Sequence, residues 1–348
     1  MTPHRLDDLL DGFPACRVAV VGDFFLDKYL DIDPSLAEPS VETGKTAHQV
    51  AAVRTSPGAA GTVVNNLSAL GTGTIHAIGA IGDDGEGYDL RRGLEARGAS
   101  TAGLMASPAL MTPTYLKPRD RTVAGLAGEH ERYDTKNRQP TPPDVVQRVI
   151  AALDSVLGDL DAVIVADQVV EPECGVVTAR LRGELADRAR SRGNVVFWAD
   201  SRARIHEFRR VITKPNQFEA VGRTWPSPGE VVPLDALRQA VAGLRARSGA
   251  PVCATCGERG AVVSDEELSL VPGVRLDGPI DPTGAGDSVT AGAVLALAAG
   301  ATLAEAALVG VLAASITVQQ LGTTGTATRE QLAGRLPAWR RQQGLSAS

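Results

Sequence analysis

The segment DPTGAGDSVTAGAVLALAAG, residues 281–300, joins a turn of small residues to a long apolar run. Gly284, Ala285 and Gly286 let another group approach the backbone closely, and the run that follows predicts a helix starting there. The free N–H groups at a helix start bind anions, phosphate above all. Asp287 either caps this helix or acts as a base that takes a proton from an attacking hydroxyl. The local pattern leaves both interpretations open.

Short β-branched runs alternate with longer helical patterns along the rest of the chain. This alternation predicts an α/β fold, a doubly wound and mainly parallel sheet with helices on both faces and ligands at the carboxyl edge of its strands. The expected strands are 17–22, 75–81, 161–167, 194–200, 211–213 and 251–255, with a hairpin over 261–271. The expected helices are 60–70, 85–97, 143–157, 174–192, one from about 216, 234–248, and two apolar helices after Gly284.

Two polar segments, 28–57 and 108–135, interrupt the alternation. Their hints of two-residue periodicity predict extra strands outside the main sheet that form a small flap, or lid, over its edge. Long surface loops are the alternative, although structureless loops of this length are uncommon. We therefore expect a single domain over 1–348, with its main body at about 14–27, 58–107 and 136–340 and a frayed tail from Arg340.

Composition excludes several classes of protein. The 348 residues are 43% hydrophobic and 22% charged with a net charge of −6, which is typical of a soluble globular chain and gives no reason to expect nucleic-acid binding. The acidic N-terminus is unlike a signal peptide, and Glu305 divides the apolar stretch 288–318, so two buried helices are favoured over a membrane span and a cytoplasmic protein is expected. Cys253 and Cys256 form a single C-x-x-C pair, for which buried reduced thiols are favoured over a zinc or redox site.

Five segments resemble, in order, motifs of the ribokinase/PfkB family of sugar kinases. They are SPGAAGTVVNNLSALG (56–71), IGDDGEGYDLRRGLEARGAS (81–100), KPNQFEA (214–220), TCGERGAVV (255–263) and the opening DPTGAGD (281–287). Within the family, VVGDFFLDKYL (20–30) and LGTTGTAT (321–328) resemble the ADP-heptose-pathway kinases, which phosphorylate heptose 7-phosphate at C1. The resemblance implies a ribokinase-like fold and an ATP-dependent carbohydrate kinase that uses Mg²⁺.

The resemblance also implies roles for particular residues. Asp287 matches the catalytic base, and the amides of Gly284, Ala285 and Gly286 match the anion hole for the transferred phosphoryl group. Asn216 and Glu219 match the motif that organises Mg²⁺ and its waters, and Asp281 matches a position near a monovalent-cation (K⁺) site. The loop over ATP corresponds to Thr255, Gly257 and Gly260. Sugar contacts correspond to Asp23, Asp27, Gly58, Thr62 and Asn66.

The sequence departs from the family on the expected sugar side. Ala59 stands where a second glycine is usual, and Thr62 where a sugar-binding asparagine is usual. The heptose-kinase motif D-Y-x-K-G is Asp-Gln-Val-Val-Glu at 167–171, and the family's D-P-K is Asp-Ser-Arg at 200–202. The phosphoryl-transfer motifs are unchanged, so the acceptor is the open question. Lys117, Arg119 or Arg202 could hold a substrate phosphate, or each could be a solvated surface charge.

Three alternatives remain at this point. The acceptor could be another sugar or a nucleoside, or the chain could be a non-catalytic ligand-binding protein on the same scaffold. A nicotinamide-dependent dehydrogenase is disfavoured because His76 stands where the third glycine after Gly71-Thr72-Gly73 would be. Flap strands pair between subunits in this family, so the resemblance favours a homodimer through the lid, with no nucleic-acid or membrane partner.

Overall fold

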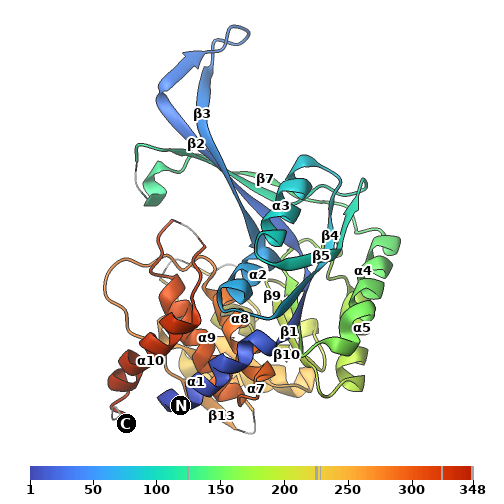
Figure 1. Ribbon diagram of the computed structural model, residues 1–348, viewed down its shortest axis with the longest axis vertical. Coiled ribbons are helices and arrows are strands. Elements are labelled where there is room, and N and C mark those ends of the chain that lie inside the picture. The colour runs from blue at the N-terminus through green and yellow to red at the C-terminus, as the bar shows by residue number, and fades with distance from the viewer. Residues whose placement is uncertain (124, 224–225, 228, 266, 323, 346–348) are drawn as a thin grey trace.

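A nine-stranded sheet forms the centre of the protein (Figure 1). The computed structural model describes residues 1–123, 125–223, 226–227, 229–265, 267–322 and 324–345, so one residue of the 321–328 segment lies outside the described part. The strand order is β13-β12-β11-β10-β9-β8-β1-β4-β5, parallel from β11 to β5, with β12 and β13 antiparallel. The bounds are β1 Arg17–Gly22, β4 Thr74–Gly82, β5 Ala99–Ser107, β8 Ala162–Asp167, β9 Val196–Ser201, β10 Ile212–Thr213, β11 Val252–Thr255, β12 Ala261–Ser264 and β13 Leu268–Val271. The predicted α/β fold class is confirmed.

Helices cover both faces of this sheet because alternate strand residues point to opposite sides. Val18 and Val20 pack with α2, α8 and α9, whereas Ala19 and Val21 pack with α4 and α5. The helices are α1 Pro3–Gly12, α2 Ala60–Ala69, α3 Gly85–Glu95, α4 Pro143–Val156, α5 Ala179–Ser191, α6 Gln217–Ala220, α7 Leu234–Ser248, α8 Ala285–Ala298, α9 Leu303–Thr317 and α10 Arg329–Gln342. Short 3₁₀ turns are η1 Phe13–Ala15, η2 Gly125–Gly128, η3 Leu157–Asp159, η4 Ile205–Glu207 and η5 Gly257–Arg259.

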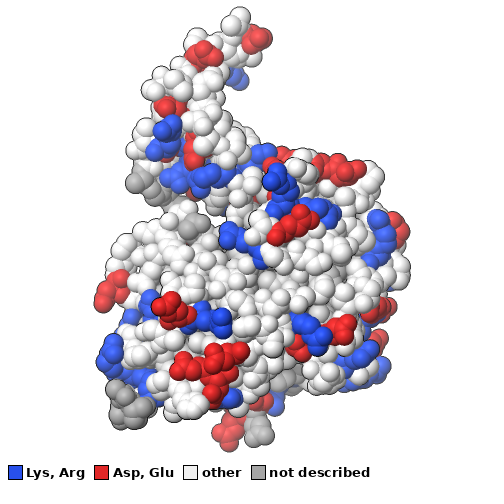
Figure 2. Space-filling model, viewed as in Figure 1, with Lys and Arg blue, Asp and Glu red and all other residues white. Residues whose placement is uncertain are grey.

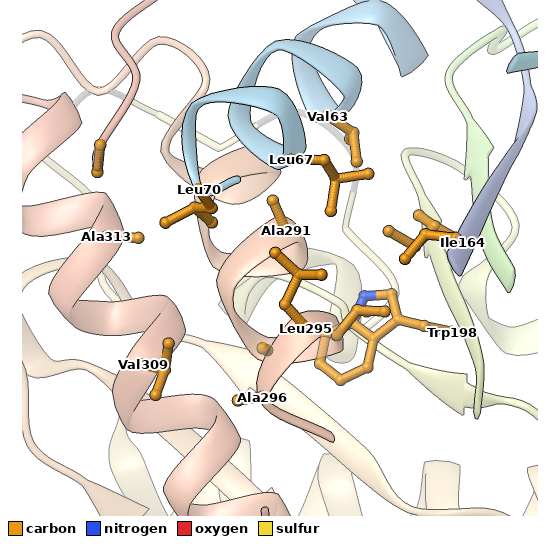
Figure 3. Packing of buried hydrophobic residues seen from close by; sticks show 14 of the residues in the cluster. Val63, Leu67, Leu70, Ile164, Trp198, Ala291, Leu295, Ala296, Val309 and Ala313 are labelled. Atoms are coloured by element: carbon orange, nitrogen blue, oxygen red, sulfur yellow. The ribbon is translucent and has the colours of Figure 1, made fainter. Parts of the chain in front are cut away.

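Helix α8 lies in the core between α2, α9 and the sheet (Figure 3). Small residues let α8 and α9 approach closely: a Cβ atom added at Gly310 would lie 2.7 Å from the carbonyl oxygen of Val289. The two apolar helices expected after Gly284 are therefore buried. No helix among the described residues has the length and apolarity needed to cross a membrane.

A second sheet of four strands projects from the body (Figure 1). Its order is β3-β2-β6-β7, with β2 Phe24–Pro39, β3 Thr46–Ala59, β6 Thr114–Asp120 and β7 Tyr133–Thr135. β2 and β3 form a long antiparallel ribbon whose outer part is exposed, and basic side chains gather where it joins the body (Figure 2). β2 follows β1 after one residue, and β3 leads directly into α2. The second sheet is therefore connected to the main body through β1 and α2, at the carboxyl edge of the main sheet.

Two predicted boundaries are wrong. The helix expected from Cys174 begins at Ala179, with Thr178 as its N-cap, because the Val176 amide before it donates to the Asp23 side chain instead of starting a helix. The tail expected to fray from Arg340 is helical to Gln342, and the buried Arg340 side chain donates to the carbonyl oxygen of Met1. All four cysteines are buried free thiols, as expected.

Candidate active site

The carboxyl ends of the parallel strands bring charged side chains to one edge of the sheet. Asp200 lies at the end of β9 and Lys214 directly follows β10. Both are buried, and the Lys214 Nζ lies 2.8 Å from Asp200 Oδ2. A Cβ atom added at Gly286 would lie 3.3 Å from the same Nζ, so the ammonium group sits against the first turn of α8. The pair therefore links the sheet edge to the start of that helix.

The first turn of α8 offers backbone amides to a ligand. Gly284 is the N-cap and has a φ of 77°, a conformation that glycine adopts without strain. Within the described residues, no acceptor of the chain pairs with the amides of Gly284, Gly286 or Asp287. The Ala285 amide, which the resemblance also assigns to the anion hole, donates to the Pro282 carbonyl oxygen at 3.1 Å in this conformation. The available donors thus extend one residue further into the helix than the resemblance implied.

Asp287 lies half-buried in this turn with an unusually basic carboxylate. Its pKa is raised to about 7, first by burial and then by the nearby Asp200 carboxylate, while Lys214 and Arg202 oppose the rise. A carboxylate with a pKa near neutrality is matched to accepting a proton at neutral pH. Of the two interpretations of Asp287, the site chemistry favours the base, since among the described residues no backbone amide of the α8 start donates to the Asp287 carboxylate.

Asn216 and Glu219 form a reciprocal cap at the start of α6. The Asn216 side chain accepts from the amides of Phe218 and Glu219, and Glu219 Oε2 accepts from the Asn216 amide at 2.7 Å. Burial, then the Asp200 carboxylate, raise the pKa of Glu219 to about 7. The cap fixes this carboxylate in the same negative cluster as Asp200 and Asp287.

A cleft of about 730 Å³ lies beside the start of α8. Gly286 and Ala285 line one wall, and Thr255, Gly257 and Gly260 from the loop after β11 line another. Gly260 has a φ of 95°, and a Cβ there would lie 2.1 Å from the Val271 carbonyl oxygen, so only glycine fits where this loop meets β13. The cleft brings together the predicted ATP-loop residues and one wall of the predicted anion hole.

A second cavity of about 150 Å³ lies beneath the projecting sheet. Its lining combines Phe25 and Tyr115 with the basic residues Arg132, Lys136 and Arg202. Close to Phe25 along β2, Asp27 pairs with Lys117 Nζ at 2.9 Å, and a Cβ added at Gly58 would lie 2.8 Å from Asp27 Oδ2. Two of the predicted sugar-side residues, Asp27 and Gly58, are thus adjacent at the base of the ribbon.

Comparisons with known proteins agree with this geometry. The family model described as pfkB family carbohydrate kinase matches residues 17–329. The chain belongs to this family. It is a sugar kinase, a phosphotransferase with an alcohol group as acceptor, as predicted.

Relatives of this PfkB chain include the bifunctional protein HldE of Gluconacetobacter diazotrophicus, 31% identical over 334 residues, which cover 92% of this chain and 64% of the relative. HldE of Caulobacter vibrioides is 30% identical over 345 residues, with 91% and 64% covered. The chain therefore spans less than two thirds of the length of these relatives.

Solved structures share the ribokinase-like fold. Phosphofructokinase-2 from Escherichia coli in complex with fructose-6-phosphate has a TM-score of 0.67 at 18% identity, covering 93% of this chain and 99% of that one. Arabidopsis thaliana ribokinase complexed with ribose and ATP has a TM-score of 0.64 at 16% identity, covering 92% and 98%.

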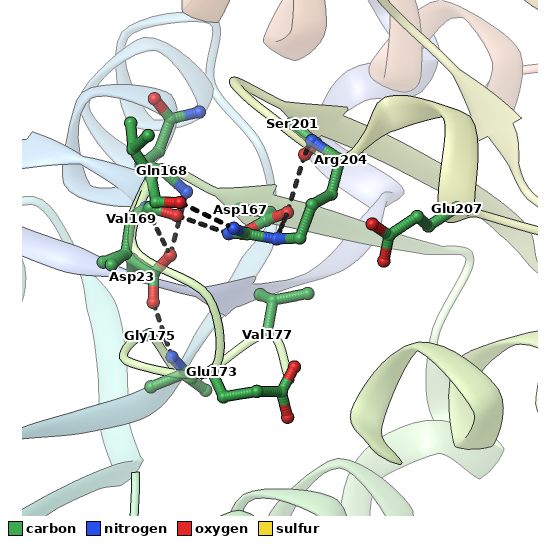
Figure 4. Close-up of polar contacts among 12 residues, drawn as sticks. Asp23, Asp167, Gln168, Val169, Glu173, Gly175, Val177, Ser201, Arg204 and Glu207 are labelled. Atoms are coloured by element: carbon green, nitrogen blue, oxygen red, sulfur yellow. Dashed lines mark hydrogen bonds and ion pairs between the residues drawn. The ribbon is translucent and has the colours of Figure 1, made fainter. Parts of the chain in front are cut away.

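Three predicted sugar-side residues of the PfkB chain are not placed as expected. Asn66 is buried in α2 and donates to the Thr62 carbonyl oxygen, and Thr62 itself is buried next to Gly284. The Asp23 carboxylate accepts three backbone amides from a neighbouring loop (Figure 4). In this conformation all three serve the packing of the body, and none of them lines either cavity.

The remaining predicted residues are tied to local structure. Asp281 accepts from the amides of Thr283 and Gly322. Burial raises its pKa, but the Thr283 side chain and these two amides outweigh burial and lower the pKa overall. The three side chains proposed to hold a substrate phosphate differ in whether they have an ion-pair partner. Lys117 pairs with Asp27, and Arg119 lies 3.9 Å from Asp31. For Arg202 the described residues hold no ion-pair partner, and its side chain is exposed toward the smaller cavity.

Sequence reasoning missed Lys214 as a functional residue and treated Asp200 only as a departure from the family pattern. The signal was present, since Lys214 precedes the Asn216 motif by two residues. A lone lysine before a proline suggests a surface charge, and only the structure shows that it lies under the start of α8.

We expect Asp287→Asn to stabilise the fold at high pH. The folded-state pKa of about 7 lies above the ordinary value of 3.8, so the contribution of this group to stability is complete below pH 4 and is lost as pH rises through 7. This difference corresponds to about 4 kcal/mol, and we expect about half because the side chain is partly open to solvent.

Urea unfolding at pH 4 and pH 8 measures this effect, with Asp83→Asn, an exposed carboxylate, as the control. The free energies of unfolding of Asp287→Asn and wild type should agree at pH 4 and separate at pH 8. Equal stability at both pH values would contradict the raised pKa.

Proposed function

We propose that this protein transfers the γ-phosphoryl group of ATP to a hydroxyl of a sugar phosphate, with a heptose 7-phosphate phosphorylated at C1 as the first candidate. The observation that carries the proposal is the placement of Asp287, a carboxylate with a pKa of about 7, in the first turn of α8. Gly286 before it lines the larger cleft, and Arg202, which interacts with it electrostatically, lines the smaller one. The larger cleft has room for a nucleotide, and the smaller one lies where the acceptor would enter.

The proposed step follows from the placement of Asp287. Its carboxylate accepts the proton of the acceptor hydroxyl while that oxygen bonds to the γ-phosphorus. The bond from phosphorus to the β–γ bridging oxygen breaks, which leaves ADP. The amides of Gly286 and Asp287 donate to the transferred group, and the Lys214 ammonium lies beneath them. The second sheet, at about 28–57 and 108–135 of a single kinase domain, acts as a lid that keeps water out.

The negative cluster suits a divalent cation. Asp200, Glu219 and Asp287 face two cations, Lys214 and Arg202, so one carboxylate is left without a counter-charge. Burial and then the Asp200 carboxylate raise the pKa values of Glu219 and Asp287. Among the described residues no group of three or more His, Cys, Asp or Glu side chains forms a metal site by itself. Glu219 would hold Mg²⁺ through its waters, and bound Mg²⁺ supplies charge neutralisation on the nucleotide phosphates. We place a K⁺ site, if one is used, near Asp281.

The smaller cavity supports an acceptor that carries a phosphate. The lysine of the heptose-kinase motif D-Y-x-K-G is Val170 here, so positive charge at this position is lost. Arg132, Lys136 and Arg202 supply it from other elements. Arg132 is bound to Asp134, and Lys136 lies 3.9 Å from Glu171, which leaves Arg202 as the most available cation. The resemblance of residues 20–30 to heptose-pathway kinases supports the same class of acceptor.

We expect Asp287→Asn to reduce turnover by about 10²–10⁴ while ATP binding is nearly unchanged, because only proton transfer is lost. Coupled ADP release measures turnover, and calorimetric titration with ATP and Mg²⁺ measures binding. Asp83→Asn is again the control. Unimpaired turnover in Asp287→Asn would refute the base assignment.

We expect Arg202→Gln to raise the KM for a phosphorylated acceptor about 10–100-fold, because one charge-assisted hydrogen bond to the phosphate is lost. The KM for ATP should stay within about twofold of the wild-type value. Activity is measured at pH 8.5, where Asp287 stays ionised without Arg202. The acceptor panel contains ribose, fructose, ribose 5-phosphate, fructose 6-phosphate and heptose 7-phosphate.

Arg138→Gln is the matched control for Arg202→Gln, since Arg138 is exposed and does not line the cavity. If wild type uses sugars with and without phosphate equally well, the acceptor class is wrong. If Arg202→Gln leaves every KM unchanged, Arg202 does not bind the phosphate.

We propose that two copies pair through the edge strand β3. β3 is an outer strand of the second sheet, and Val50 and Val53 on it are 44% and 55% exposed. An unpaired edge of this length is a site for strand addition. Light scattering should give about twice the chain mass of 36.2 kDa, and Val53→Lys should lower it toward one chain. A wild-type mass of one chain would exclude this dimer.

A further inference from the structure

Asp23 is buried at the carboxyl edge of the sheet, yet it lines neither of the two cavities described above. It directly follows β1 and is 3% exposed. Its Oδ2 accepts from the amides of Gln168 and Val169 at 2.8 and 3.1 Å, and its Oδ1 accepts from the Val176 amide at 2.7 Å (Figure 4). A side chain from one strand thus holds both ends of the loop 168–176 that follows another strand.

A second charged group holds the same loop from the other side. Arg204 donates to the carbonyl oxygens of Val169 and Val170, and its guanidinium also binds the fully buried Asp167 (Figure 4). Asp167 additionally accepts from the Ser201 hydroxyl at 2.6 Å. The loop amides therefore face a carboxylate and the loop carbonyls face a guanidinium, which fixes the orientation of its peptide groups.

The loop needs this support because its own conformation is unfavourable. Glu173 has a φ of 59°, which is uncommon for a residue with a side chain. A Cβ added at Gly175 would lie 2.7 Å from Asp23 Oδ1, so the carboxylate packs directly on the loop backbone. Burial and then the Asp167 charge raise the pKa of Asp23 to about 6, which the three amides oppose. Keeping this carboxylate buried is costly, and its bonds all go to one loop.

That loop forms one wall of the smaller cavity. Gln168, Val169, Val170, Glu171 and Cys174 all line it, opposite Phe25, Tyr115 and Arg202. We propose that Asp23, Asp167 and Arg204 are positioning residues that set the shape of the acceptor pocket by clamping the loop 168–176, and that Asp23 does not contact the sugar. The identity of this cavity as the acceptor pocket rests on the proposed function.

Two variants test the clamp in the full chain. Asp23→Asn keeps the size of the side chain but turns an amide group toward loop N–H donors. Arg204→Lys keeps the charge beside Asp167 but cannot reach the Val169 and Val170 carbonyls together. The matched control is Asp161→Asn, because Asp161 accepts the Arg17 amide at 2.8 Å at the opposite end of the same strands.

The first measurement is hydrogen exchange without substrate. Peptides covering 168–176 should exchange at least about tenfold faster in both variants, with α8 peptides unchanged, and Asp161→Asn should match wild type. The second is kinetics with the panel compound of lowest KM: the acceptor KM should rise at least about tenfold, with the KM for ATP within about twofold.

Unchanged exchange in both variants would overturn the clamp. A raised acceptor KM in Asp23→Asn without faster exchange would also overturn it, because that is the result expected of a direct sugar ligand. Equal increases in both KM values would show general disruption and likewise count against it. If no panel compound is phosphorylated by wild type, the proposed function fails, and the exchange experiment alone decides the clamp.

Discussion

One buried ammonium among three carboxylates organises this active site. Lys214 is bound to Asp200 at 2.8 Å, and Glu219 and Asp287 are close enough to Lys214 to interact with it electrostatically. Burying these charges away from water costs free energy unless they are paired, so Lys214 and Asp200 must stay in contact in the folded state. Their contact holds the ends of β9 and β10 against the start of α8. Burial and then the Asp200 carboxylate raise the pKa values of Glu219 and Asp287 to about 7, and Lys214 opposes the rise. The same ammonium group therefore lies against the helix start and limits the pKa of the proposed base, Asp287.

Helix α8, which carries the proposed base Asp287, is held in place mainly by the close packing of small side chains. α8 is apolar all round and is enclosed by α2, α9 and the sheet (Figure 3). Gly292 faces Gly310 across the α8–α9 contact, so the two helices approach closely enough to hold α8 rigidly. A rigid helix keeps its first-turn amides in place before a ligand arrives, which is the condition for electrostatic stabilisation without reorganisation.

Much of this could be predicted from the sequence, because periodicity and glycine position report local structure. The alternation of β-branched and amphipathic runs located the strands of the main sheet except the edge strand β5, and the Gly284 turn located the start of α8. Contacts between distant segments could not be predicted in the same way. The bond from Val176 to Asp23 delays helix α5, and the turn at Pro282 occupies the Ala285 amide. Both are single hydrogen bonds that leave no periodic signal.

The same limit explains why similar carboxylates at neighbouring positions have different surroundings. Asp23 and Asp27 both follow β1, and the sequence suggests the same role for each. In the structure Asp27 lies on β2 beside Gly58 and Lys117, whereas Asp23 is turned toward the loop after β8. The proposed phosphoryl-transfer residues and the wall of the proposed acceptor pocket are consequently held by separate charge networks, Asp200 with Lys214 and Asp23 with Asp167 and Arg204. Separate supports let the sequence at 168–171 depart from the heptose-kinase pattern without disturbing α8.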